Sequence, residues 1–221
     1  MSAAPKRNDK TPRWIYVIHD VAKFFAAVPG IIWFRPKIRY ISKEAKKKIK
    51  GGALLICNHT SIFDPVYLMY TVWYRRHHFI CLKELTEAKL GWLLKLFLCI
   101  PIDRENFSMA SFREITGHLS DGHIVSMFPE GHIKTEENAG MGSFKSGMVL
   151  MAAKSKTPIV PIYIRKKAHF WSRFAAAIGE PVDIAANYGA FPSFAQIEQI
   201  TQLLYEKEKE LEDSIEKGEK S

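Results

Sequence analysis

The sequence predicts an α/β fold: a mostly parallel sheet flanked by helices, with an N-terminal amphipathic, membrane-associating helical segment. Two observations carry this prediction. Beyond residue 51, apolar runs of strand length alternate with longer helical patterns, the order typical of a parallel α/β sheet. Before that point, an aromatic-rich helical pattern is followed by a run of lysines and arginines, a composition typical of helices at membrane interfaces.

Charge is distributed unevenly along the 221 residues, a length that corresponds to about one domain. The chain has a net charge of +9, but its first 50 residues hold 13 Lys/Arg and 3 Asp/Glu, a net +10, so the remainder is close to neutral. Such a basic segment indicates attraction to a polyanionic surface, either membrane or nucleic acid. We therefore divide the chain into a basic, amphipathic membrane-docking segment (1–50), an α/β domain (51–192) and a C-terminal amphipathic helix packed on it (193–221).

The N-terminal helical pattern covers residues 14–28. A period of 3.6 places seven apolar residues on one arc: Trp14, Val17, Ile18, Val21, Phe24, Phe25 and Val28. Pro29-Gly30 is expected to end the helix, and no apolar run then reaches the roughly 20 residues that span a bilayer. The arc either packs on the protein's own core or lies in a membrane interface, and its aromatic residues and flanking cations favour the interface.

The remaining elements follow in order. Strands are expected at 53–57, 79–82, 100–103, 124–128 and 159–164, and helices at 65–76, 87–98, 108–119 and 145–154. Ser193 and Gln196 form a predicted capping box for a last helix, whose solvent face is the charged run 206–213. The three cysteines, Cys57, Cys81 and Cys99, show no metal-ligand spacing and indicate a reducing compartment.

The first candidate site follows the strand at 53–57. Ligands of open α/β sheets gather where strands end, and His59 and Asp64 lie in such a turn. An imidazole accepts a proton from an alcohol near neutral pH, and a carboxylate on its other nitrogen fixes the tautomer. A spacing of five residues brings the two together only through a turn, and Asp64 before Pro65 also suits a plain helix cap. Ser61 as a nucleophile lacks the G-x-S-x-G pattern.

Two further strand ends carry polar residues. Arg104 follows the strand at 100–103 and either pairs with a neighbouring carboxylate or recognises a phosphate by two parallel hydrogen bonds. Glu130 and Gly131 follow the strand at 124–128 and form either an ordinary turn or a place where backbone and carboxylate approach a ligand. We expect no metal site, because the histidines lack HExxH-type spacing (His59, His77, His78, His123 and His132).

Taken together, these blocks resemble the glycerophospholipid acyltransferase family, whose best-known members are the lysophosphatidic acid acyltransferases. The matching blocks, in family order, are 58–64 (NHTSIFD), 100–104 (IPIDR), 128–131 (FPEG) and 159–162 (IVPI). Two departures stand out. Leu98 occupies a position where the family commonly has glycine, and His132-Ile133-Lys134 replace the Thr or Ser followed by Arg that often continues the third block.

The resemblance implies transfer of a fatty acyl group from acyl-CoA or acyl carrier protein to a hydroxyl of a lysophospholipid, most simply 1-acyl-sn-glycerol-3-phosphate, without a cofactor. It implies that His59 is the general base, that Asp64 orients it, and that Arg104, Glu130 and Gly131 bind the acceptor, with Lys134 replacing the missing arginine. Another lysolipid or aminolipid acceptor, or a non-catalytic lipid-binding module, stays open. We expect a peripheral protein on the cytoplasmic side of the cell membrane, with anionic lipids as partners and no nucleic acid.

Overall fold

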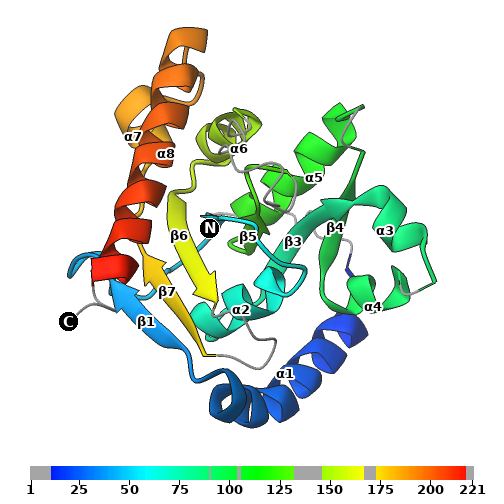
Figure 1. Cartoon of the computed structure of the whole chain (residues 1–221). Helices are drawn as coiled ribbons and strands as arrows, with labels where there is room; N and C mark the ends of the chain where they lie inside the picture. Colours follow the sequence, from blue (N-terminus) through cyan, green and yellow to red (C-terminus); the bar gives the residue numbers. More distant parts are fainter. Residues whose placement is uncertain (1–10, 90, 104–105, 132–145, 167–172, 218–221) are drawn as a thin grey trace, which may run out of the picture.

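The computed structural model describes residues 11–89, 91–103, 106–131, 146–166 and 173–217. Within them, one sheet has the strand order β1-β7-β6-β2-β5-β3-β4 (Figure 1). The strands are β1 (Lys37–Tyr40), β2 (Ala53–Cys57), β3 (His77–Leu82), β4 (Cys99–Ile102), β5 (Ile124–Met127), β6 (Ile159–Lys166) and β7 (Phe174–Ile178). The helices are α1 (Arg13–Phe34), α2 (Asp64–Thr71), α3 (Lys83–Glu87), α4 (Gly91–Leu96), α5 (Met109–Ser120), α6 (Gly147–Ser155), α7 (Ile184–Tyr188) and α8 (Phe194–Lys217).

The prediction of a mostly parallel sheet flanked by helices is confirmed. Strands β2, β3, β4, β5 and β6 run parallel, while β7 runs antiparallel to β6 and carries β1 at the edge. The middle strand β2 is buried throughout, because helices cover both of its faces. On one face, α5, α6 and α8 pack on residues such as Leu54 and Ile56; on the other, α2 and the end of α1 pack on Leu55 and Cys57.

Several predicted boundaries were wrong. The helix expected at 65–76 ends at Thr71, and the one expected at 87–98 is two short helices, α3 and α4. Strands β1 and β7 were not predicted at all: β1 is a short edge strand in which charged and apolar residues alternate, and β7 is an alanine-rich segment whose only β-branched residue is Ile178. Strand β1 falls within the segment 1–50, so part of that segment belongs to the sheet.

Helix α1 continues through Pro29, where the sequence predicted its end. Proline removes one helical hydrogen bond, and the Tyr70 hydroxyl donates to the carbonyl oxygen of Ala26 in that same turn at 2.7 Å. Gly30 lets Tyr70 come this close, because a Cβ at residue 30 would lie 1.7 Å from the Tyr70 hydroxyl oxygen. The helix ends at Phe34, and the next residue, Arg35, has a left-handed conformation and donates its backbone N–H to the carbonyl oxygen of Ile31.

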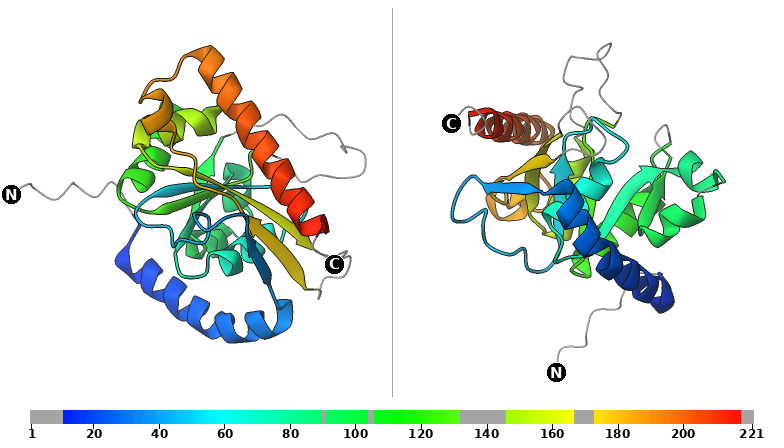
Figure 2. Two further views of the ribbon diagram at one scale, coloured as in Figure 1. Left: turned by 90° about the vertical axis from the view of Figure 1, so that its left-hand side faces the viewer. Right: turned by 60° about the horizontal axis from the view of Figure 1, so that its bottom comes forward.

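Helix α1 exposes its apolar face and buries polar residues, the opposite of what a helix packed on the core does. The seven apolar residues of the predicted arc are all exposed, Phe24 at 75% and Phe25 at 73%, whereas Tyr16 and His19 are buried against the domain. Figure 2 shows α1 lying along the outside of the domain. With 22 residues and a mean hydropathy of 1.5 over its most apolar window, α1 also has the length and composition of a membrane-crossing helix, so the expectation that no segment reaches that length was wrong.

Helix α8 shows the ordinary arrangement. Its capping box is formed as predicted, with Ser193 N–H donating to Gln196 Oε1 at 2.8 Å and Gln196 N–H donating to Ser193 Oγ at 3.3 Å. Leu204 and Leu211 face the core. Glu208, assigned to the solvent face, is completely buried, because it lies four residues after Leu204 and three before Leu211 on the same helical stripe.

Candidate active site

The turn between β2 and α2 is organised around the carboxylate of Asp64. Its Oδ2 accepts a hydrogen bond from His59 Nδ1 at 3.0 Å and two more from the backbone N–H groups of Thr60 and Ser61, at 2.6 and 2.7 Å. Asp64 is 1% exposed. It is the first residue of α2 and does not cap that helix; it closes the preceding turn. The carboxylate therefore folds the chain back so that residues five apart in sequence meet.

Asn58 fastens this turn to the sheet. Its side-chain amide donates to the carbonyl of Ile164 at 2.9 Å and accepts from the N–H of the same residue at 2.8 Å. Asn58 is almost fully buried beyond the last paired residue of β2, so the two bonds extend the β2–β6 contact by side chain. Asn58 was not among the predicted site residues, although buried side-chain amides are nearly always hydrogen-bonded and can anchor a turn in this way.

The His59 ring is fixed on its face as well as at its edge. Phe128, which follows β5, stacks on it with ring centroids 4.1 Å apart and an interplanar angle of 17°. Because a carboxylate only accepts, the proton of the neutral ring belongs on Nδ1, which leaves the lone pair on Nε2. The side chain keeps 17% of its surface exposed. His59 thus presents a free base nitrogen in a fixed direction. Phe128 is the first residue of the third family block, but its contact with His59 could not be predicted from the sequence.

Glu130 and Gly131 form a tight turn after β5. Gly131 has φ +74° and donates its N–H to the carbonyl of Phe128 at 3.0 Å, a conformation that favours glycine. The Glu130 side chain is 1% exposed. Burial and the carboxylates of Asp64, Glu208 and Glu130 raise the pKa of the Cys57 thiol well above its ordinary value. Acidic groups from β2–α2, β5 and α8 therefore gather around the end of β2.

The other predicted site residues lie outside the described parts of the chain. These are Arg104 and Lys134; on either side of residues 104–105, Asp103 accepts a hydrogen bond from the N–H of Asn106 at 2.8 Å. Ser61 Oγ accepts from the N–H of Phe63 at 3.3 Å and so is engaged in the turn. Among the residues that the structure describes, no group of three or more His, Cys, Asp or Glu side chains is placed to hold a metal ion.

The region of the chain that contains this site also matches known proteins in sequence. A family model described as acyltransferase matches residues 37–165, more than half of the chain and the whole span of the three strand ends. The chain belongs to the acyltransferase family. The prediction of family and enzyme class is thereby confirmed, and His59, Asp64 and Glu130 lie inside the matched region.

Individual acyltransferases are similar over different lengths. A 1-acyl-sn-glycerol-3-phosphate acyltransferase of Bacillus subtilis is 29% identical over 87% of this chain and 98% of its own length. One of Streptococcus pneumoniae is 30% identical over 49% of this chain and 40% of its own. The solved structure of the 1-acyl-sn-glycerophosphate acyltransferase PlsC from Thermotoga maritima has a TM-score of 0.63 at 22% identity and covers 90% of this chain and 79% of its own, which supports the fold.

One departure of this acyltransferase from the family's sequence pattern has a structural counterpart. Leu98, at a position where we expect glycine in the family, has φ +55°, in the left-handed region that disfavours a branched side chain. It is nevertheless 4% exposed. Its burial in the core opposes the backbone cost of that conformation, since burying a leucine contributes about 1.5–3 kcal/mol.

Proposed function

We propose that this acyltransferase transfers a fatty acyl group to the free hydroxyl of 1-acyl-sn-glycerol-3-phosphate and so forms phosphatidic acid. The observation that carries the proposal is the His59–Asp64 pair, held by Oδ2 of Asp64 and by the Phe128 ring. The relatives named as 1-acyl-sn-glycerol-3-phosphate acyltransferases support this choice of acceptor over other lysolipids. The donor is a thioester of coenzyme A or of acyl carrier protein.

The chemistry is direct transfer with His59 as general base. Nε2 accepts the proton of the acceptor hydroxyl as its oxygen attacks the thioester carbonyl; the C–S bond then breaks, and the departing thiolate takes the proton from the imidazolium. An alcohol is a weak nucleophile and needs a base, whereas a thiolate leaves readily, so no acyl-enzyme is required. Asp64 accepts the hydrogen bond from the Nδ1–H of His59 and so stabilises the imidazolium. Before the reaction, the same bond keeps the proton of the neutral ring on Nδ1 and leaves Nε2 unprotonated.

Acceptor binding is assigned to the neighbouring strand ends. Arg104 would hold the phosphate through its planar guanidinium, with Lys134 as a second cation, while the backbone at Gly131 and the carboxylate of Glu130 would contact the glycerol. Glu130 and Gly131 follow β5, which lies beside β2 in the sheet, so they are neighbours of the His59 turn. The replacement of the usual arginine by Lys134 predicts weaker discrimination for the phosphate headgroup than a second guanidinium would give.

The proposed place of action is the surface of the membrane that holds the acceptor. The exposed apolar face of α1 continues beyond Phe25 through Ile31, Ile32 and Trp33, each about half exposed or more. Large exposed apolar faces mark interaction sites, and lysines and arginines beside them favour an anionic leaflet. We assign this face to an anionic lipid surface.

The contacts of the polar face of α1 favour lying in the interface over crossing the membrane. Tyr16 bonds to His78, His19 to the carbonyl of Leu96, and Asp20 to Arg76, all of them in the domain. Crossing would break these contacts and take charges into hydrocarbon, which costs several kcal/mol. The basic segment and the free thiols of the three cysteines support the cytoplasmic side.

A thiol-release assay tests the function. The purified protein is given acyl-CoA or acyl carrier protein thioester together with 1-acyl-sn-glycerol-3-phosphate or another lysolipid, and free thiol and product lipid are measured. Wild type should release thiol fastest with the phosphate-bearing acceptor. His59→Gln should lower kcat by about 10²–10⁴-fold, the usual contribution of a general base.

Ser61→Ala is the matched control within the same turn. It should keep activity near wild type, because direct attack uses no serine, and the backbone N–H that bonds Asp64 is retained. Full activity of His59→Gln, or loss of activity with formation of a covalent acyl adduct on Ser61, would overturn the mechanism. Release of no thiol with any acceptor, despite vesicle binding, would point to the non-catalytic lipid-binding module.

A further inference from the structure

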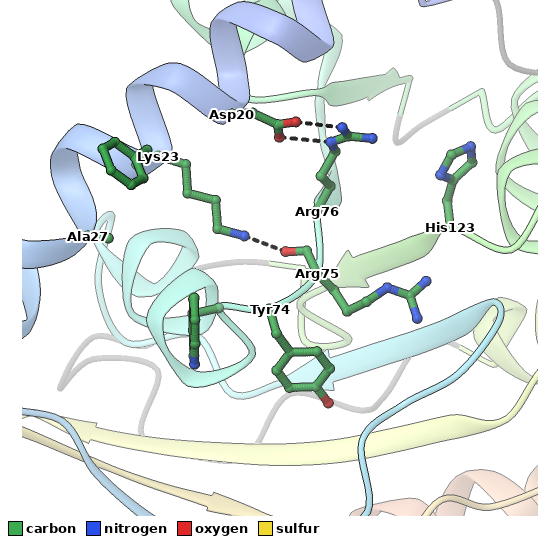
Figure 3. Close-up of a pocket in the computed structure, with 9 residues that line it drawn as sticks. Asp20, Lys23, Ala27, Tyr74, Arg75, Arg76 and His123 are labelled. Atoms are coloured by element: carbon green, nitrogen blue, oxygen red, sulfur yellow. Dashed lines mark hydrogen bonds and ion pairs between the residues drawn. The ribbon is translucent and has the colours of Figure 1, made fainter.

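A cavity lies far from His59, between α1 and the amino ends of β3 and β5. It has a volume of about 520 Å³, within the range of ligand pockets. Its lining comes from α1, from the turn between α2 and β3, and from the residue before β5: Asp20, Lys23, Phe24, Ala27, Trp73, Tyr74, Arg75, Arg76 and His123. Figure 3 shows Lys23 reaching from α1 to the backbone of Arg75, and Arg76, from the same turn as Arg75, directed toward Asp20 of α1. His59 follows the carboxyl end of β2, so a strand's length of about 15 Å separates the two sites.

The charges around the cavity are unbalanced. Three cations line it, Lys23, Arg75 and Arg76, against the single carboxylate of Asp20. Arg76 forms two hydrogen bonds with that carboxylate, at 2.8 and 2.5 Å, so the two charges offset each other. The cavity therefore keeps an excess of two positive charges, which favours an anion.

Arg75 is a fixed part of the wall. Its guanidinium donates to the carbonyl oxygens of Ile49, Gly51 and Gly122 at 2.7–2.8 Å, and so ties three loops together. Three of its five N–H donors are used in this way, and its charge also acts on the cavity. Arg75 is therefore anchored in the wall of the cavity and raises the local potential there.

Lys23 is the cation that the described residues hold by the fewest hydrogen bonds. Its ammonium group gives one hydrogen bond, at 2.6 Å, to the carbonyl oxygen of Arg75 (Figure 3). An ammonium has three N–H donors, and the described residues accept only this one. Burial, and to a smaller degree the charge of Arg76, lower the pKa of Lys23 to about 8. An anion bound beside it would restore its preference for the charged form.

The rim of the cavity is apolar and faces the proposed membrane side. Phe24, on the outward face of α1, is 75% exposed, and Trp73, on the α2–β3 turn, is 59% exposed. Aromatic side chains concentrate at the level of lipid headgroups, where one part of the ring is apolar and the other meets water. Lys23 lines the same cavity as Phe24 and Trp73, so it is available to the phosphate of a lipid whose apolar part contacts this rim.

We propose that this cavity binds the phosphate of an anionic membrane phospholipid, with Lys23 as its ligand and Phe24 and Trp73 against its glycerol and acyl chains. The site is separate from the acceptor site at His59, and it would orient the docked protein as well as hold it. The inference rests on the proposed placement of α1 at a lipid surface.

Titration with short-chain lipids below their micelle concentration tests the site directly. Dihexanoyl phosphatidylglycerol should shift the Trp73 indole N–H and the backbone amides of residues 75 and 76 in NMR spectra, and dihexanoyl phosphatidylcholine should not. Lys23→Met keeps the side-chain stem and should abolish these shifts, while Lys23→Arg should restore them. Lys43→Met, an exposed lysine of the same basic segment outside the cavity, is the matched control and should leave them unchanged.

Vesicle sedimentation separates failure of this inference from failure of membrane docking. Wild type should bind phosphatidylglycerol vesicles more tightly than phosphatidylcholine vesicles, and Lys23→Met should lose about fivefold on the anionic vesicles only, since one cation near the surface contributes about 1 kcal/mol. If wild type binds neither vesicle, the proposed membrane placement is wrong. If it binds both but Lys23→Met and Lys43→Met lose affinity equally, the charge acts without a site and the inference fails.

Coenzyme A provides the last arm, because it also carries phosphate groups. Added without lipid, it should leave the Trp73 and Arg76 signals unchanged. Shifts that depend on Lys23 would instead assign the cavity to the donor and overturn the lipid assignment.

Discussion

Helices α1 and α8 are both amphipathic, but they turn opposite faces to the protein. Helix α8 buries Leu204, Leu211 and Ile215 against one face of the sheet, while α1 lies on the other side, exposes its phenylalanines and turns its polar residues inward (Figure 2). A periodic pattern therefore identifies two faces without saying which one the domain keeps. That choice depends on partners distant in sequence: α1 meets Arg76, His78 and Tyr70, each of which follows its partner residue on α1 by at least 44 positions.

Truncation of the buried stripe of α8 should have the largest effect on stability. Leu204→Ala removes a fully buried side chain from the main core and should lower the free energy of unfolding by about 2–5 kcal/mol. Urea denaturation measures this loss, and vesicle affinity at a temperature where the variant is folded should match wild type. A change in vesicle affinity without loss of stability would mean that α8, too, meets the membrane.

The same kind of truncation on α1 should leave stability unchanged and weaken membrane binding. Phe25 is 73% exposed, so Phe25→Ala should shift the free energy of unfolding by no more than about 0.5 kcal/mol. Vesicle affinity should fall about ten- to a hundredfold, because a phenylalanine buried in the interface contributes about 1.5–3 kcal/mol. Sedimentation with phosphatidylcholine vesicles measures this without a charge effect. A loss of stability comparable to that of Leu204→Ala would show that the exposed face of α1 has a protein partner.

The two helices also differ in the titratable groups beside them: α8 contains no histidine, whereas a buried histidine lies at the start of β3, near α1. His77, at the start of β3, is completely buried between Ser126 and the carbonyl of Val72, and burial lowers its pKa to about 3. Between pH 6.5 and 3 the unfolded chain binds a proton that the folded chain excludes. The contribution of His77 to the free energy of unfolding is therefore complete above pH 6.5. Below that pH it should fall by about 1.4 kcal/mol per pH unit.

His77→Gln isolates this contribution. Urea denaturation at pH 7.5, 6.0 and 5.0 should show a decline in the variant that is shallower than in wild type by about that slope. An identical decline in both proteins would assign the acid sensitivity to other groups.

These contrasts also explain how much could be predicted from the sequence. The His59–Asp64 pair and the Ser193–Gln196 capping box join residues three to five apart, so local turn and helix geometry determines them. The stacking of Phe128 on His59 and the bonds of Asn58 to Ile164 join residues that meet only in the folded sheet. Glu208 could have been placed from the helical period alone, but its charge argued for the surface.

The smallest expected effect on stability comes from the capping box at the start of α8, which was predicted from the sequence alone. Ser193→Ala removes the side-chain acceptor for the Gln196 N–H at the start of α8 and should cost about 1 kcal/mol of stability, the usual value of a helix cap. Ser193→Asp keeps an acceptor at the same place and should retain most of it. Ser120→Ala, which removes the hydroxyl of an exposed serine at the end of α5, supplies the comparison and should cost less. If both substitutions cost the same, the capping box contributes nothing beyond the general loss of a surface hydroxyl, and α8 is held by the packing of Leu204 and Leu211 alone.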